Sequence, residues 1–233
     1  MTLLKHYSTE VYDVRDIWYK SFDCPVCEAY FQAPRVFSNS IRVSKRESDL
    51  MPHYEGVNPL FYDLVTCEHC MFTAFEKEFS NPKILKKSEL LEKISKLSRR
   101  SKEIYKDINL RENRTVDDAI AIHILGASTY HILGGDRELS EIYLRLGWLY
   151  RLKGDRQKEL HSLGRALKYF ERVYQTTSDP EALQRSLFYI AEINRRLGQK
   201  NEAVKYYSEL FQRFRNVQSV YLKTARQNWE EIR

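Results

Sequence analysis

The sequence has few cysteines and no long apolar run, and both scarcities narrow what the protein can be. Only 4 cysteines occur in 233 residues, which excludes a disulfide-rich secreted scaffold. No apolar stretch approaches the ~20 residues that a membrane-spanning helix needs. The first residues, Met1 to Tyr7, lack the apolar run and the small-residue cleavage site of a signal peptide. We therefore expect a cytoplasmic protein without a membrane partner.

Glycine is also scarce, with 8 residues, and the catalytic motifs that depend on it are missing. The sequence contains no Gly-rich loop ending in a Walker lysine, no dinucleotide-binding fingerprint and no G-x-S-x-G nucleophile turn. It also lacks the H-E-x-x-H pair of zinc proteases. We therefore expect that the protein is not an enzyme.

The cysteines form two pairs of identical spacing, C-P-V-C at residues 24–27 and C-E-H-C at residues 67–70. Two residues between two cysteines let one tight turn deliver both sulfurs to one ion, and four thiolates close a tetrahedral site. The pattern therefore predicts a structural zinc ion held by four ligands, Cys24, Cys27, Cys67 and Cys70. Because four sulfurs fill the coordination sphere, no position is left for a catalytic water.

Other interpretations of the cysteines stay open. A rubredoxin-like iron site uses the same ligands, and metal availability decides between the two ions. In a thiol–disulfide enzyme, one pair would lie at the start of a helix, and the second pair would be unexplained. Four unrelated thiols would not share this spacing by chance. His69 lies inside the second pair, and we expect it to be a surface residue because the flanking cysteines already have ligand spacing.

Short strands are expected around both pairs. Residues 30–37 form an expected strand that Pro34 interrupts, and residues 41–46 alternate apolar and polar as in a half-buried strand. Residues 49–59 contain two prolines and are expected to form a loop, and residues 60–66 a strand that leads into the second pair. Strand, turn and strand, repeated, is the order of a zinc ribbon or rubredoxin. Metal binding would supply the stability that so small a sheet lacks.

Further residues around the two pairs are similar to a known family. They are Phe31, the basic residues from Arg42 to Arg46, Asp49, Tyr54, Asn58-Pro59, Phe61 or Tyr62, Ala74, Phe75 and Phe79. With the two pairs, they make the first 80 residues resemble an uncharacterised bacterial family, the domain of unknown function numbered 2225. The resemblance implies a metal-binding protein without an assigned activity. The sequence departs from the usual turn at Glu28 and Met71, where glycine is common, and a residue with a Cβ is costlier there if φ is positive.

The charge and the apolar period both change along the chain. Residues 1–80 hold 8 Lys and Arg against 12 Asp and Glu, whereas the remaining residues hold 30 against 20. From Asn81-Pro82 on, apolar residues recur at helical spacing. We therefore expect a zinc-ribbon-like metal-binding domain over residues 1–80 and a domain of six or seven helices over residues 81–233. The expected fold class is α+β and mostly α.

Two helical hairpins in the second half resemble tetratricopeptide repeats. Each has a small residue, Gly147 or Ala191, followed by a glycine, Gly154 or Gly198, that would end the first helix in a left-handed cap. The two end glycines are 44 residues apart instead of the usual ~34, so the repeats are irregular. Such arrays have concave surfaces that hold peptides or protein helices. The antiparallel helical-hairpin domain therefore predicts a protein or peptide partner.

A basic segment opens the second half. Between Lys83 and Arg114 the sequence holds 11 Lys and Arg against 5 Asp and Glu, and we expect a basic helix over residues 83–114. Such a face could bind phosphate backbones, although Lys and Arg are also ordinary residues of a solvated helix face. The sequence thus predicts a zinc-binding protein-interaction module. A nucleic-acid-binding zinc-ribbon protein is the alternative, and an iron or thiol redox protein is the second alternative.

Overall fold

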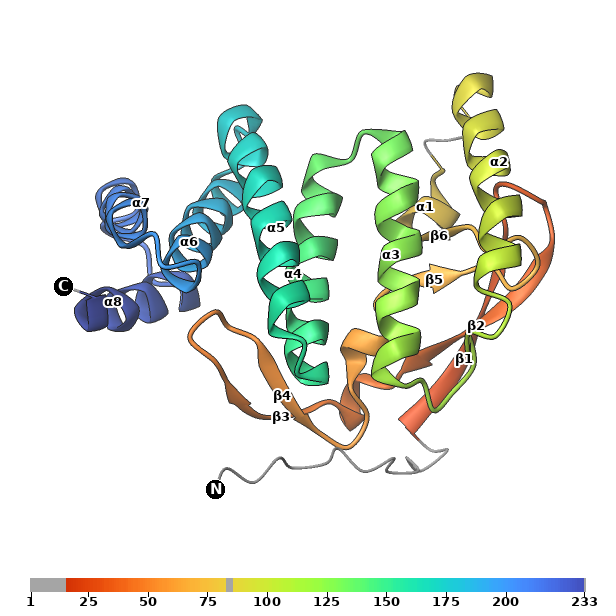
Figure 1. The fold of residues 1–233 in the computed structure, drawn as a ribbon, viewed down its shortest axis with the longest axis horizontal. Helices are drawn as coiled ribbons and strands as arrows, with labels where there is room; N and C mark the ends of the chain where they lie inside the picture. Colours follow the sequence, from red (N-terminus) through yellow and green to blue (C-terminus); the bar gives the residue numbers. More distant parts are fainter. Residues whose placement is uncertain (1–15, 83–85, 233) are drawn as a thin grey trace. The chain divides into compact units, whose positions relative to one another are not determined.

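A computed structural model describes residues 16–82 and 86–232, and its fold is α+β and mostly α, as expected (Figure 1). The described chain divides into two compact units. The first consists of the residues up to Ser44 and from Tyr54 to Ile132, and the second of Lys45–His53 and the residues from Leu133 on. The two units are defined by packing contacts alone. The domain boundary expected between residues 80 and 81 therefore stays a prediction.

Two antiparallel strand pairs of the first unit enclose the two cysteine pairs. The strands are β1 (Ile17–Asp23) with β2 (Tyr30–Val36), and β5 (Val65–Thr66) with β6 (Thr73–Ala74). The expected order of strand, turn and strand is therefore confirmed. Pro34 does not interrupt β2, since it stands opposite Tyr19 in the register. A two-stranded sheet has only edge strands, and an edge tolerates proline.

The segment between these two strand pairs contains a further hairpin, which the sequence did not predict. β3 (Arg42–Arg46) is a strand, but all of its residues are exposed, so the half-buried face predicted there is wrong. The expected loop over residues 49–59 contains β4 (Pro52–Glu55), which pairs with β3. Pairing with β3 satisfies backbone N–H and C=O groups of β4. The proline and glycine content on which the loop prediction rested does not reveal this pairing.

The expected strand over residues 60–66 is mostly a 3₁₀ helix, Pro59–Tyr62, and only Val65–Thr66 are extended. Asn58 starts this helix, because its side-chain oxygen accepts a hydrogen bond from the Leu60 N–H at 3.0 Å. Proline at the first helical position fits the same start. The capping signal of Asn58 therefore outweighs the strand propensity of the aromatic and β-branched residues after it.

The basic segment is helical over a shorter range than expected. After the single turn α1 (Lys77–Ser80), α2 covers Ser88–Ile104, and turns follow it; residues 83–85 lie outside the described part. The prediction of a basic helix up to residue 114 is therefore wrong beyond Ile104. Asn109 helps to explain this, because its side-chain oxygen accepts a hydrogen bond from the Arg111 N–H at 2.9 Å and so favours a turn over a helix.

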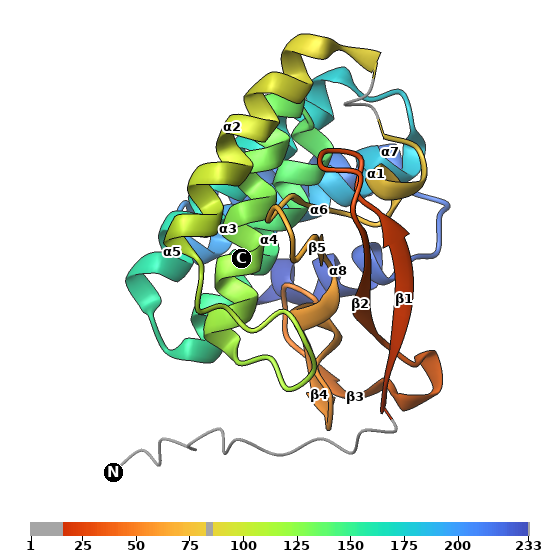
Figure 2. The same cartoon turned by 90° about the vertical axis from the view of Figure 1, so that its right-hand side faces the viewer.

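The last helix of the first unit, α3 (Val116–Leu133), begins at a reciprocal cap. The Thr115 hydroxyl oxygen accepts from the Asp118 N–H at 3.2 Å, and the Asp118 carboxylate accepts from the Thr115 N–H at 2.8 Å. The residue order Thr-Val-Asp-Asp predicts such a cap at the start of a helix, and the structure confirms it. Figures 1 and 2 both show α2 beside α3.

The second unit is built from antiparallel helical hairpins. Its helices are α4 (Asp136–Lys153), α5 (Arg156–Thr176), α6 (Pro180–Arg196), α7 (Lys200–Arg213) and α8 (Val220–Ile232). Together with α2 and α3 they give the expected number of helices in the described residues after residue 81. Gly154 and Gly198 adopt the expected left-handed backbone, with φ of 82° and 79°. Asp179 caps α6 by accepting from the Glu181 N–H, as its position before Pro180 predicts.

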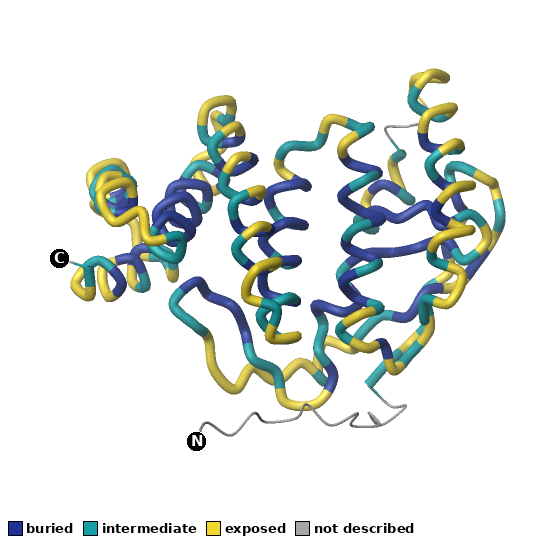
Figure 3. The backbone as a smooth tube through the Cα atoms, in the orientation of Figure 1, coloured by how far each residue is buried: buried dark blue, intermediate teal, exposed yellow. Residues whose placement is uncertain are grey.

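The core of the second unit is centred on α6, which packs against α5, α7 and α8. Most residues of α6 are buried, whereas α7 and α8 bury only one face each (Figure 3). Throughout the described ranges, no helix is both long enough and apolar enough to cross a membrane.

Candidate metal centre

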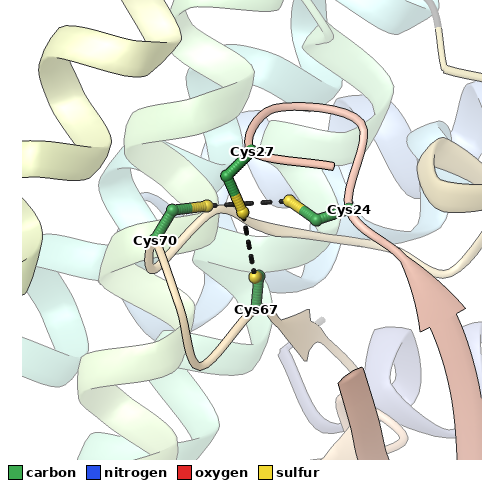
Figure 4. A group of neighbouring side chains, drawn as sticks. All are labelled: Cys24, Cys27, Cys67 and Cys70. Atoms are coloured by element: carbon green, nitrogen blue, oxygen red, sulfur yellow. Dashed lines mark hydrogen bonds between the residues drawn. The ribbon is translucent and has the colours of Figure 1, made fainter. Parts of the chain in front are cut away.

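The four cysteines meet between the turns that join β1 to β2 and β5 to β6 (Figure 4). Their sulfurs all lie within 4.8 Å of one another. Cys24 Sγ is 3.6 Å from Cys70 Sγ, and Cys27 Sγ is 3.7 Å from Cys67 Sγ. Four sulfurs at ~2.3 Å from one tetrahedral ion stand about 3.8 Å apart, whereas disulfide sulfurs stand about 2.0 Å apart. The spacing therefore fits a metal ion and does not fit disulfides.

The two turns have the same backbone hydrogen bonds, although their sequences share only the cysteines. In each turn the first cysteine donates to the carbonyl five residues later, and the residue four positions later donates back to that cysteine's carbonyl. The distances are 3.0 Å for Cys24 to Ala29, 2.9 Å for Cys67 to Phe72, 2.9 Å for Glu28 to Cys24 and 2.7 Å for Met71 to Cys67. Two equal turns present two sulfurs each to a common centre.

Glu28 and Met71 close these turns in the left-handed backbone region, with φ of 61° and 64°. The conformational cost that the sequence implied at these two positions is therefore present. A residue with a Cβ is destabilised by about 1–2 kcal/mol at such φ angles, because its Cβ is too close to a backbone carbonyl oxygen. Backbone strain of this kind is typical of turns that hold a ligand.

The electrostatics of the cluster are compatible with a bound cation. Hydrogen bonds from the thiols of Cys67 and Cys70 lower the pKa of Cys24 to about 2. The same hydrogen bonds raise the pKa of Cys67 to about 12, and they raise the pKa of Cys70 as well, with burial adding to both. Backbone N–H groups of Val26 and Cys27 help to stabilise the Cys24 thiolate. All four thiols can ionise together only if a bound cation balances them, and metal ions deprotonate the thiols that bind them.

Contacts outside the turns hold the two strand pairs in position. Phe79 of α1 packs against Phe22 of β1 and against Phe72 at the end of the second turn, with ring centroids 5.4 Å and 5.3 Å apart. Glu76, just before α1, pairs with Arg35 of β2. These contacts fix the separation of the turns, so the four sulfurs are placed by the framework of the first unit as well as by the turns.

The sequence identified the four cysteines that the structure brings together, and it placed His69 correctly at the surface. It missed Arg111, whose guanidinium lies 2.6 Å from the Glu68 carboxylate inside the second turn and 6.0 Å from the ring centre of Tyr19. Arg111 lies 43 positions after Glu68, and no spacing pattern relates the two. The basic character of residues 83–114 is the only sequence signal that includes Arg111.

Comparison with known proteins places the chain in a family. Residues 17–232 match the model of a family described as an uncharacterised protein conserved in bacteria, DUF2225. No curated protein and no solved structure matches the chain. The matched range includes the cysteine turns and the helices of both units, so the resemblance first carried by about 80 residues extends over nearly the whole chain. The chain therefore belongs to the bacterial DUF2225 family.

Proposed function

We propose that the protein is a cytoplasmic, zinc-stabilised protein-interaction module and not an enzyme, with one zinc ion held by Cys24, Cys27, Cys67 and Cys70. The observation that carries the proposal is the gathering of four sulfurs within 4.8 Å of one another on two turns of equal geometry. A four-thiolate zinc site is closed, because no coordination position remains for water or substrate. The ion's role is therefore to fix the fold of the first unit.

The interaction role is supported by two exposed arginines that stack on buried tyrosines of the same helical hairpin. Arg165 lies over the ring of Tyr143 at 5.2 Å from its centre, and Arg172 lies over Tyr169 at 5.1 Å. Tyrosine and arginine are the residue types that dominate binding hot spots. Stacked pairs of this kind are also rigid, which lowers the entropy lost when a partner binds.

One surface of the second unit is already used by the chain itself. Ser48 accepts hydrogen bonds from Arg195 at 2.6 Å and Arg196 at 3.1 Å, and Asn228 donates to the Ser48 carbonyl at 2.9 Å. These side chains come from the end of α6 and from α8. A protein partner must therefore bind elsewhere.

Metal analysis of the purified protein tests the proposal. We expect one zinc ion per chain, and we expect the double variant Cys67→Ser, Cys70→Ser to lose both the ion and the fold of the first unit. The matched control is His69→Ala, which changes an exposed residue inside the same turn and should keep the zinc. Iron with visible iron–thiolate absorption would support the redox alternative instead. Absence of any metal, also after refolding with zinc, would contradict the proposal.

The nucleic-acid-binding alternative is favoured by the cations of α2. Two of them are already partnered, however, because Lys93 lies 2.5 Å from Glu89 and Lys96 lies 2.6 Å from Glu92. Nucleic-acid binding predicts an affinity whose logarithm falls linearly with the logarithm of salt concentration, since bound phosphates release counterions. A titration of single-stranded and duplex DNA at two salt concentrations measures this.

A further inference from the structure

A groove of about 490 Å³ lies between α2 and α3, within the first compact unit. Its α2 side includes Leu97 and Ile104, and its α3 side includes Leu125 and Ile132. Ile104 is 68% exposed, although it is one of the most apolar residue types. The groove therefore has an apolar floor of Leu97, Ile104 and Ile132 that the chain covers only in part, whereas Leu125 is buried.

The groove stays open because α2 buries few large residues. Of the α2 residues, only Ile94, Ser98 and Ser101 are buried, and two of these are serines. The leucine and isoleucine side chains of α2 at the groove remain partly or fully accessible. The accessible apolar side chains of α2 therefore lie beside cationic ones on the face that lines the groove.

The charges at the groove are of one sign. Lys93, Lys96 and Arg100 line it, and no carboxylate does. The carboxylates that pair with the two lysines are 75% and 65% exposed, and such exposed helical pairs stabilise by only about 0.3–0.5 kcal/mol. Among the described residues, no carboxylate forms an ion pair with Arg100. A ligand carboxylate can therefore replace or join the existing pairs at little cost.

The spacing of these cations indicates the shape of the ligand. Lys93, Lys96 and Arg100 recur at i, i+3 and i+7, so they form one stripe along α2, about 10 Å long at 1.5 Å per residue. A second helix laid in the groove presents its own side chains at the same spacing. An amphipathic helix in a groove between two helices is a recurring mode of peptide recognition.

We propose that the groove between α2 and α3 binds an acidic amphipathic helix of a protein partner. The apolar side of that helix covers Leu97, Ile104 and Ile132, and its carboxylates bind Lys96 and Arg100. This inference rests on the proposed interaction function and specifies its surface and the chemistry of its partner. A phosphate backbone would use the cations but would leave the apolar floor uncovered, so the floor favours a helix over a nucleic acid.

The test uses a fluorescently labelled synthetic helix with leucines on one side and glutamates flanking them, titrated with the full-length protein. Its counterpart carries lysines in place of the glutamates. We expect the glutamate peptide to bind and the lysine peptide not to bind. Lys96→Glu with Arg100→Glu should weaken binding at least about ten-fold, which corresponds to about 1.4 kcal/mol.

The matched control reverses the same amount of charge on the same helix outside the groove. Arg99→Glu with Lys102→Glu changes two exposed residues that do not line it, and we expect this variant to bind almost as the native protein does. Ile104→Ser should also weaken binding, which identifies the apolar contribution separately from the charge. Equal losses in the two charge variants, or no effect of Ile104→Ser, would contradict the groove and indicate general electrostatic attraction.

Two further probes separate this inference from other ligands and from the proposed function. Vesicles of phosphatidylglycerol and single-stranded DNA are titrated in parallel, and groove-dependent binding of either, without binding of the peptide, would overturn the helix as ligand. Zinc content is measured on every sample. Protein that retains its zinc but binds no peptide contradicts this inference alone, whereas protein without metal contradicts the proposed zinc site.

Discussion

Asp49 Oδ2 lies 2.7 Å from Nη2 of Arg151, and Asp49 is only 1% exposed. Arg196 Nε lies 3.2 Å from the same oxygen, and Trp148 Nε1 donates to it at 3.0 Å. Burial raises the pKa of Asp49, but the hydrogen bond from Arg151 and the charges of both arginines lower it more, so the pKa lies below its ordinary value. The second unit thus holds an ionised carboxylate at the junction of α4 and α6.

Asp49→Asn should destabilise the second unit by about 3 kcal/mol. The change leaves two largely buried guanidinium groups with one carboxylate fewer, and breaking a buried pair costs about 3–5 kcal/mol. The lower end applies because Glu47 remains 2.7 Å from Arg151, and Glu192 remains 3.1 Å from Arg196. Urea unfolding followed by helical circular dichroism measures the difference. The control is Glu230→Gln, which changes an exposed residue of α8 and should leave the urea midpoint unchanged. An equally small effect of Asp49→Asn would contradict a stabilising role of Asp49.

The same carboxylate makes the stability of the second unit depend on pH in acid. The pKa of Asp49 is lowered on folding, and so is that of Glu141, because Arg145 and Arg185 outweigh the effect of its burial. A group with a lowered pKa stabilises fully above its unfolded value, about 3.9 for Asp and 4.3 for Glu, and this contribution is lost as pH falls through the folded value. We therefore expect the urea concentration at the unfolding midpoint to decrease when the pH is lowered below about 4. The decrease should be smaller in Asp49→Asn than in the native protein. Parallel curves for the two proteins would exclude Asp49 as a cause.

The features that the sequence predicted correctly depend on residues within one turn of the backbone. Cysteines with two residues between them, the Thr115 and Asp118 cap, and the left-handed glycines at 154 and 198 each act over a few residues, so their spacing carries the geometry. Zinc itself stays a prediction, because four clustered sulfurs fit more than one ion.

The features that the sequence missed depend on partners far along the chain. Asp49 is 102 positions from Arg151, and Ser48 is 147 positions from Arg195, so proline and glycine alone suggested a loop there. The exposure of β3 likewise depends on what packs against it, which alternation of residue types does not reveal. Asn58 acts locally as well, but the strand expected over residues 60–66 took no account of its cap.

Glu28→Gly should stabilise the first cysteine turn by about 1 kcal/mol, because glycine adopts the left-handed backbone at φ 61° without a Cβ clash. Met71→Gly removes the same strain at φ 64° but also removes a side chain that is 6% exposed. Burial of a methionine is worth about 1.5–3 kcal/mol, so this second change should destabilise. Thermal unfolding, together with the chelator concentration that removes the metal, measures both. Destabilisation by Glu28→Gly would show that its side chain matters more than its backbone.

Gly147→Ala should destabilise the α4–α5 hairpin, because an added Cβ would stand 2.7 Å from Cδ2 and 3.0 Å from Cγ of Leu163. Leu163 is 0% exposed and cannot move aside freely, so overpacking of about 1–3 kcal/mol is expected. The matched control is Gly164→Ala in α5, where no atom lies within 4 Å of the added Cβ, and where alanine should stabilise the helix by about 1 kcal/mol.

Shortening Leu163 should relieve the clash that Gly147→Ala creates. A double variant therefore tests the contact between the two positions. Leu163→Ala alone should cost about 2–5 kcal/mol through the cavity it leaves. Combined with Gly147→Ala, it should cost less than the sum of the two single changes, because the new methyl group fills part of that space. Strict additivity would mean that the two residues do not meet. A smaller combined cost would show that the small residue at 147 lets α4 and α5 approach closely.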